Sequence, residues 1–310
     1  MLHHQQQILT ALDGHEIHVQ LWQPDGECSR LIQVLHGLGE HADRYARFAS
    51  AAAERGYAVC VHNHRGHGGH SGLPRHFADA DGWHTVIADA EIVNTWISKQ
   101  FTKTPIVLLG HSMGSYIAQA FAMYYSARLS GLILSASTWP SRMQLLPLLV
   151  VAHIESWRHD ARGKSPLLDR LGFGNFNKPF LPARTDHDWL SRDDAEVDKY
   201  VDDPLCGGPY SCRLWRDLIG GLFQISSDSA LMRIPSDLPI LITGGQSDPV
   251  GGDKGMTRLA MHYAQTSHQR LTVKIYEGGR HEMLNEINRD EVTSDWLNWI
   301  STTKGTLRSG

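Results

Sequence analysis

The stretch GHSMG, residues 110–114, has the residue types and spacing needed for nucleophilic catalysis by Ser112. It follows an apolar run, PIVLLG, and precedes a helix-like run, SYIAQAFAMYYS. A Gly-x-Ser-x-Gly turn between a buried strand and a helix is typical of a nucleophile elbow, which exposes the serine hydroxyl on a tight turn. The pattern by itself also occurs in ordinary turns, so the flanking strand and helix decide in favour of a catalytic serine.

A catalytic serine needs a base, and the base needs an acid that orients it. With this type of elbow the chain order is serine, then acid, then histidine. Asp248 follows the apolar run LPILITGG, and His281 follows the last such run, LTVKIYEGG. We therefore predict that Ser112, Asp248 and His281 form a catalytic triad. Asp253 is the alternative acid, but it lies farther from the strand end and is better placed to begin a helix.

The carbonyl oxygen of a substrate under attack gains negative charge, which backbone N–H groups can stabilise. Met113 lies at the start of the helix after the serine, so its N–H is one candidate donor. A second donor is expected in the loop after an early strand, and the run RLIQVLHGLG places Leu38 there. We predict that Leu38 and Met113 form the oxyanion hole.

The elements around these residues predict an α/β fold with a mostly parallel central sheet and helices on both faces. The chain opens with a hairpin signal, in which two alternating runs flank Asp13-Gly14. Apolar runs without alternation then alternate with helical patterns, which is typical of parallel strands buried on both faces. The predicted strands are 30–36, 57–63, 105–110, 129–136, 238–245 and 271–279, and the predicted helices are 43–56, 82–101, 115–126, 252–266 and 290–302.

The alternation of predicted strands and helices is interrupted by residues 137–236, which predict an inserted, mainly helical cap over the core. We divide the chain into an N-terminal core part (1–136), the cap (137–236) and a C-terminal core part (237–310). The cap holds one apolar run, MQLLPLLVVAHIESW, which includes Leu145 and Leu149. It is interpreted either as a helix buried against the core or as the wall of an acyl tunnel with a face toward lipid. Four cap tryptophans are expected to serve in packing: Trp139, Trp157, Trp189 and Trp215.

Composition excludes several classes of function. The net charge of −4 leaves no basic field for nucleic acid, and 41% hydrophobic residues supply a large core. No signal peptide and no apolar run of about 18 residues is apparent, so we expect a cytoplasmic protein. Cys60 is expected to be a buried thiol. Cys206 and Cys212 are close enough for a disulfide, although nothing requires one.

Four histidines within nine residues raise the question of a metal. The run HNHRGHGGH contains His62, His64, His67 and His70, and imidazoles are common zinc ligands. Its glycines indicate a loop, however, and no carboxylate lies at matching spacing. We therefore predict neither a metal nor an organic cofactor.

Taken in order, HGLGEHADRY, NHRGHGGHSG, GHSMG, SDPV and RHEMLNE resemble the monoacylglycerol lipases and lysophospholipases of the α/β-hydrolase fold. The resemblance spans nearly the whole chain, and residues 177–207 look like the cap of bacterial members. It implies the same triad and oxyanion donors. That family often has Asp where this chain has Asn63. The candidate substrate-binding residues are His36, Glu40, Arg44, His111, Leu145 and Leu149, of which Glu40 and Arg44 are suggested by the resemblance. For Glu40 and Arg44, an i,i+4 ion pair is the simpler interpretation.

These observations predict a serine ester hydrolase acting on single-chain acyl esters, foremost a monoacylglycerol or a lysophospholipid. Transient contact with a membrane or micelle through the cap would fit that role. The alternatives on the same fold are a general carboxylesterase, a serine aminopeptidase and a thioesterase. An aminopeptidase needs acidic groups to hold the substrate ammonium, and Glu40, Asp193 and Asp194 are candidates. A non-catalytic binding protein of this fold is the remaining alternative.

Overall fold

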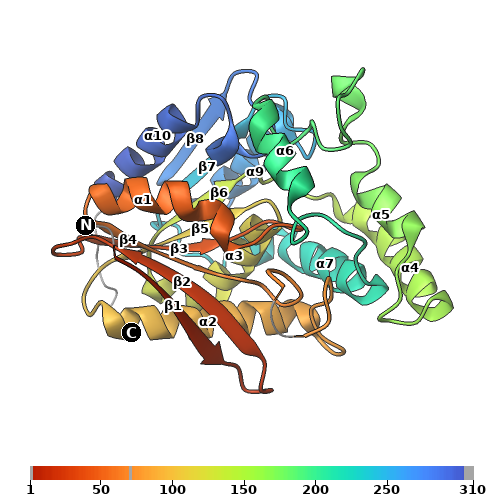
Figure 1. Ribbon diagram of the computed structural model, residues 1–310, viewed down its shortest axis with the longest axis horizontal. Coiled ribbons are helices and arrows are strands. Elements are labelled where there is room, and N and C mark those ends of the chain that lie inside the picture. The colour runs from red at the N-terminus through yellow and green to blue at the C-terminus, as the bar shows by residue number, and fades with distance from the viewer. Residues whose placement is uncertain (1–2, 70–71, 304–310) are drawn as a thin grey trace.

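A computed structural model describes residues 3–69 and 72–303, and its centre is one eight-stranded sheet (Figure 1). The strand order is β1-β2-β4-β3-β5-β6-β7-β8. β2 is antiparallel to both of its neighbours, and all the other pairs are parallel, which confirms the predicted mostly parallel sheet. The strands are β1 (His3–Thr10), β2 (Glu16–Gln23), β3 (Arg30–Leu35), β4 (Tyr57–His62), β5 (Ile106–His111), β6 (Leu129–Ser135), β7 (Ile240–Gly245) and β8 (Leu271–Tyr276).

Helices cover both faces of this sheet, as Figure 1 shows. On one face, α1 (Ala46–Glu54) and α10 (Arg289–Thr302) bury Phe48 and Trp296 against the strands. On the other face lie α2 (Gly82–Gln100), α3 (Met113–Tyr125) and α9 (Gly252–Gln265). Strands β4, β5, β6 and β7 are buried along their whole length, because both faces are covered and their apolar residues need no alternation.

The segment between β6 and β7 is helical and projects beyond the carboxyl ends of the strands (Figure 1). Its long helices, α4 and α7, pack against each other, and α7 also contacts α2 and α3. Sequence patterns predicted one helix here, whereas the structure has five. They are α4 (Arg142–Arg158), α5 (Pro166–Phe173), α6 (Asp194–Asp202), α7 (Cys212–Ile225) and α8 (Asp228–Leu231).

Helix α4 has two different apolar faces. Leu145 is buried in the main core cluster, and Leu149 is half-buried against it. An opposite stripe is exposed to solvent, with spacing of three or four residues: Met143, Leu146, Val150, Ile154 and Trp157. Trp157 is 86% exposed, so its predicted packing role is wrong. No helix among residues 3–69 and 72–303 is both long enough and apolar enough to cross a bilayer.

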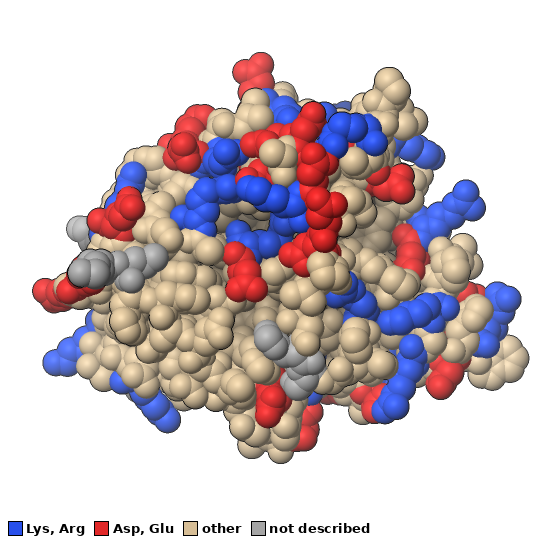
Figure 2. All heavy atoms as spheres, viewed as in Figure 1, with Lys and Arg blue, Asp and Glu red and all other residues tan. Residues whose placement is uncertain are grey.

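Charged residues are mixed over the surface. On the face drawn in Figure 2, basic and acidic side chains are interspersed, and both kinds surround a hollow. This distribution agrees with the near-balance of 29 basic and 33 acidic residues. All four cysteines are free, and Cys60 is buried as predicted.

Candidate active site

Ser112 lies on a strained turn between β5 and α3. Its φ of 51° and ψ of −119° are uncommon for a residue with a side chain, and such strain is concentrated at functional sites. The turn is held by the N–H of Ser112, which donates to the carbonyl of Ser135 at 2.9 Å. Both flanking glycines are required sterically. A Cβ on Gly114 would overlap the carbonyl of Leu35, and one on Gly110 would overlap the backbone of Gly114.

The predicted acid and base are hydrogen-bonded to each other at the same edge of the sheet. His281, in the loop after β8, shares a 2.9 Å hydrogen bond between its Nδ1 and Oδ1 of Asp248, which follows β7. Both side chains are buried. Burial alone opposes protonation of the imidazole, but the charge and hydrogen bond of Asp248 outweigh it and raise the pKa of His281. Asp248 therefore holds Nδ1 and stabilises the imidazolium form.

Asp253, the alternative acid, lies elsewhere. It is exposed in the first turn of α9, and its Oδ1 accepts the N–H of Lys254 at 2.7 Å. Asp248 lies nearer the end of β7, in the loop that reaches His281, whereas Asp253 lies farther along the chain in α9.

His111 joins the serine turn to the base. It precedes Ser112, and its ring centroid lies 4.9 Å from that of His281. Its Nδ1 is 3.2 Å from Oγ of Ser135, and the ring is buried. Burial, with the neighbouring His281, lowers the pKa of His111. A neutral ring here packs beside the base without competing for its proton.

The loop after β3 approaches Ser112 closely. A Cβ on Gly37 would lie 3.3 Å from the Cβ of Ser112, so this loop and the elbow are in contact. The N–H of Gly37 donates to Oε1 of Glu40 at 2.5 Å, and Gly39 has a φ of 78°. Leu38 lies between them. Within the described residues, the N–H groups of Leu38 and Met113 have no hydrogen-bond acceptor, which leaves both free for an oxyanion.

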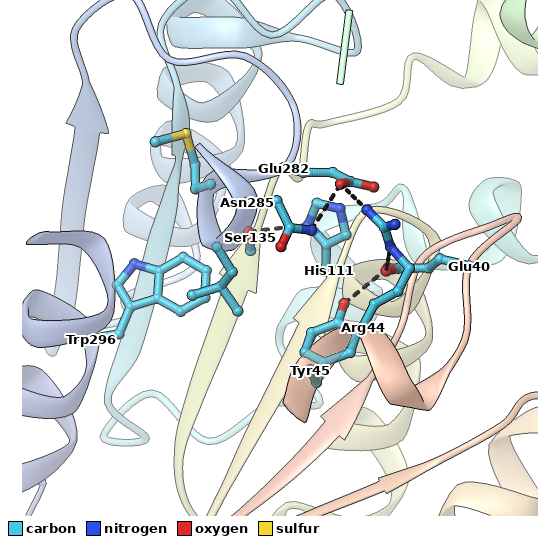
Figure 3. A pocket seen from close by; sticks show the side chains of 10 residues that line it. Glu40, Arg44, Tyr45, His111, Ser135, Glu282, Asn285 and Trp296 are labelled. Atoms are coloured by element: carbon cyan, nitrogen blue, oxygen red, sulfur yellow. Dashed lines mark hydrogen bonds and ion pairs between the residues drawn. The ribbon is translucent and has the colours of Figure 1, made fainter. Parts of the chain in front are cut away.

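A buried ionic network orders this loop (Figure 3). Arg44 pairs with Glu40 at 3.5 Å, as the i,i+4 interpretation predicted, and also with Glu282, the neighbour of His281. Tyr45 donates to Glu40 at 2.9 Å. Burial and the charge of Glu282 raise the pKa of Glu40, although Arg44 opposes the rise. The cavity among these side chains is about 20 Å³, which is room for a water-sized molecule but not for a lipid head group.

His36 and the histidine run lie beneath this loop. His36 is fully buried, with Nδ1 2.8 Å from the carbonyl of Gly37 and Nε2 accepting the N–H of His64. The rings of His62, His64 and His67 are also buried; His70 lies outside the described residues. Burial lowers the pKa of His62 to about 3 and of His67 to about 4. Because these histidine rings are neutral and buried, we assign them to supporting the loop after β3 and not to contacting substrate. Asn63 also has a structural role, because its Oδ1 accepts the N–H of Ala42 at 2.8 Å.

The cap contacts both halves of the site through residues for which the sequence held no functional signal. Trp189 places its ring centroid 4.9 Å from that of His281, and the N–H of Glu282 donates to the carbonyl of Leu190 at 2.8 Å. The N–H of Gly207 donates to the carbonyl of Gly39 at 2.8 Å. The cap is therefore hydrogen-bonded to the loop after β8, which carries His281, and to the loop after β3, which carries Leu38 (the oxyanion loop).

One group of possible metal donors lies at this junction. Among the described residues, His41, Asp203 and Cys206 bring one donor atom each within 4.8 Å of the others. His41 Nε2 and Asp203 are already paired at 2.8 Å. Burial raises the pKa of Cys206 to about 12, so its thiol stays protonated and is a poor ligand. We interpret the group as a contact between loop and cap.

Comparisons with known proteins agree with the α/β-hydrolase fold. The family model Hydrolase_4, described as serine aminopeptidase S33, matches residues 26–288. The chain is 31% identical to the monoglyceride lipase of Mus musculus, with 94% of this chain and 89% of that one covered. It is 27% identical to the monoacylglycerol lipase of Mycolicibacterium smegmatis, over 94% of this chain and 95% of that one. A thermostable carboxyl esterase from Bacillus coagulans, solved with glycerol, superposes with a TM-score of 0.89 at 26% identity, covering 97% of this chain and 98% of that one.

Proposed function

This chain belongs to the Hydrolase_4 family and is a serine hydrolase of the lipase and esterase type, and we propose that it hydrolyses single-chain acyl esters, foremost monoacylglycerols. The observation that carries the proposal is the hydrogen bond between Asp248 and His281 at the sheet edge that also holds the strained turn of Ser112. The names of the relatives support the substrate class.

In this mechanism Oγ of Ser112 attacks the ester carbonyl carbon while Nε2 of His281 accepts the hydroxyl proton. The carbonyl oxygen becomes an oxyanion, which accepts hydrogen bonds from the N–H groups of Leu38 and Met113. His281 then gives its proton to the leaving alcohol oxygen as the carbon–oxygen bond breaks. Water, deprotonated by His281, attacks the acyl-enzyme and releases the fatty acid. Asp248 holds the Nδ1–H of His281 throughout.

The two faces of α4 support an acyl substrate that arrives from a lipid surface. Leu149 is half-buried beside the core, so we assign it to contact the acyl chain, whereas Leu145 is already packed. The exposed stripe from Met143 to Trp157 is a contiguous apolar strip that would be shielded against a micelle or membrane.

Peptidase activity is disfavoured by the state of the acidic residues proposed to hold an ammonium. Glu40 is occupied by Gly37, Tyr45 and Arg44. Asp193 caps α6 and pairs with Arg289 at 2.6 Å. A binding protein without catalysis would need no strained serine beside a paired base and acid.

The test is a hydrolysis panel with Ser112→Ala measured in parallel. The panel holds a monoacylglycerol, a lysophospholipid, a short nitrophenyl ester and an amino-acyl anilide. We expect the monoacylglycerol to give the largest kcat/KM and the variant to be inactive. Equal turnover by the variant would refute the mechanism. A wild type that cleaves only the short ester or the anilide would refute the substrate class.

A further inference from the structure

The cap contains a cavity of about 410 Å³ that the mechanism above leaves without a role. Three of its aromatic lining residues come from separate segments: Phe173 at the end of α5, Trp189, and Tyr210 in the loop before α7. The Phe173 ring centroid lies 6.3 Å from that of Trp189 and 5.8 Å from that of Tyr210. The cavity is thus lined by several aromatic rings, whereas the ionic pocket of Figure 3 is far smaller.

The charged residues that line this cavity, Asp169 and Asp186, are both acidic. Asp169 is half-buried and accepts hydrogen bonds from Nε1 of Trp215 at 2.8 Å and from the N–H of Tyr210 at 3.4 Å. It forms no ion pair within the described part of the chain. Burial raises the pKa of Asp169, and the two hydrogen bonds and the charge of Lys164 oppose that rise. Burial also lowers the pKa of His187, a further lining residue, so its ring adds no positive charge at neutral pH.

Three cations lie beside this lining and have other partners. Arg44 lies 5.1 Å from the ring centroid of Tyr200, a lining residue, and its charge is matched by Glu40 and Glu282. Lys164 donates to the carbonyl of Pro74 at 3.3 Å, and Arg75 donates to the carbonyl of Cys206 at 3.0 Å. Neither lines the cavity. A partly buried carboxylate beside several aromatic faces is the arrangement that recognises an alkylammonium group, through charge and cation–π attraction.

The cavity adjoins the proposed base through a shared side chain. Trp189 contacts both the cavity and the ring of His281, which gives its proton to the leaving alcohol. Tyr210 approaches the oxyanion loop, because its hydroxyl occupies the space that a Cβ on Gly39 would need. The cavity is therefore next to both the loop of His281 and the loop of Leu38.

We propose that this cap cavity binds an alkylammonium group in the alcohol part of the ester, as in a choline-type head. The proposal rests on the proposed esterase function and deepens it by naming a preferred head group. Cationic esters should then react faster than neutral esters of the same shape and acyl chain. The expected preference is about tenfold in kcat/KM, which corresponds to about 1.4 kcal/mol.

The test uses two substrates of equal shape: lauroylcholine and its neutral carbon isostere, 3,3-dimethylbutyl laurate. We expect wild type to prefer lauroylcholine about tenfold. Asp169→Asn, which keeps the oxygen acceptor for Trp215, should reduce the ratio to about one. Asp202→Asn removes a charge from the exposed end of α6 and should leave the ratio unchanged. A wild-type ratio of one would overturn the proposal even if a variant failed to fold.

A second arm locates the ammonium relative to the scissile bond. It compares an amino-acyl anilide that has a free amine with its N-acetyl form. A preference for the free amine that depends on Asp169, without a preference for lauroylcholine, would contradict the leaving-group assignment. If the neutral laurate is cleaved by wild type but not by Ser112→Ala, the esterase function stands whatever the ratio. If no ester is cleaved, the esterase function itself fails.

Discussion

The strand-end loops that carry the proposed triad and the exposed faces of the helical cap are built to different requirements. Around the elbow the packing leaves no free space. Gly114 in the first turn of α3 has no room for a methyl group, and Asp248 and His281 are buried against each other. The cap is tightly packed only in part: Gly221 of α7 is enclosed by Trp83, but the neighbouring Gly220 has open space around it, and α4 exposes large apolar side chains. The proposed catalysis thus depends on tightly packed positions, whereas contact with lipid is assigned to an exposed helix face.

The largest expected effect separates the two acids after β7. Asp248→Asn should reduce kcat/KM about 10³- to 10⁴-fold, because the imidazole loses the partner that sets its tautomer. Asp253→Asn should change it by less than about twofold, because that carboxylate is exposed and contacts only its own helix start. Steady-state kinetics on a short nitrophenyl ester compares the two variants. Equal losses would contradict the assignment of the acid.

The contrast between elbow and cap can be measured with one methyl group. Gly114→Ala should lower the free energy of unfolding by about 2–4 kcal/mol, because the new Cβ overlaps the carbonyl of Leu35. Gly220→Ala should raise it by about 0.5–1 kcal/mol, since alanine costs less backbone entropy in an unobstructed helix. Urea unfolding of both variants reports the difference. A destabilised Gly220→Ala would show that this open side of α7 is as tightly specified as the elbow.

The exposed stripe of α4 is tested with the double variant Val150→Ser and Ile154→Ser. Turnover of emulsified monoacylglycerol should fall about five- to tenfold, because less apolar area enters the lipid surface. Turnover of a soluble ester should be retained. His153→Ser, exposed on the same helix but polar to begin with, is the control. Parallel losses on both substrates would mean that the stripe supports folding, not interfacial contact.

The smallest effect concerns pH. His281 must be neutral to act as a base, and the negative charge of Glu282 contributes to its raised pKa. Glu282→Gln should lower the pKa of His281, so activity should persist to lower pH and the acid limb of kcat/KM should shift down. Glu277→Gln, exposed in the same loop, should leave the limb in place. An unchanged or upward shift for Glu282→Gln would contradict the electrostatic account.

Much of the core was predictable because its signals are local. Unbroken apolar runs such as β5 identify buried strands. The chain order of serine, acid and histidine that goes with this type of elbow then predicts the proposed triad residues at the ends of those strands. The cap was less predictable, because α5, α6 and α8 are short and the longer α7 mixes apolar with charged residues. The contact of Trp189 with His281 depends on tertiary packing, and no pattern around that tryptophan indicates it. Glu282 was visible beside the base, but only the fold brings Arg44 to it.

Active-site labelling tests the central claim most directly. The protein is treated with a fluorophosphonate, digested, and the adduct is located by mass spectrometry. The account predicts one adduct, on Ser112, with labelling strongly slowed in His281→Ala because the hydroxyl loses its base. An adduct on another serine, such as Ser115 or Ser135, or no adduct in the active preparation, would contradict it.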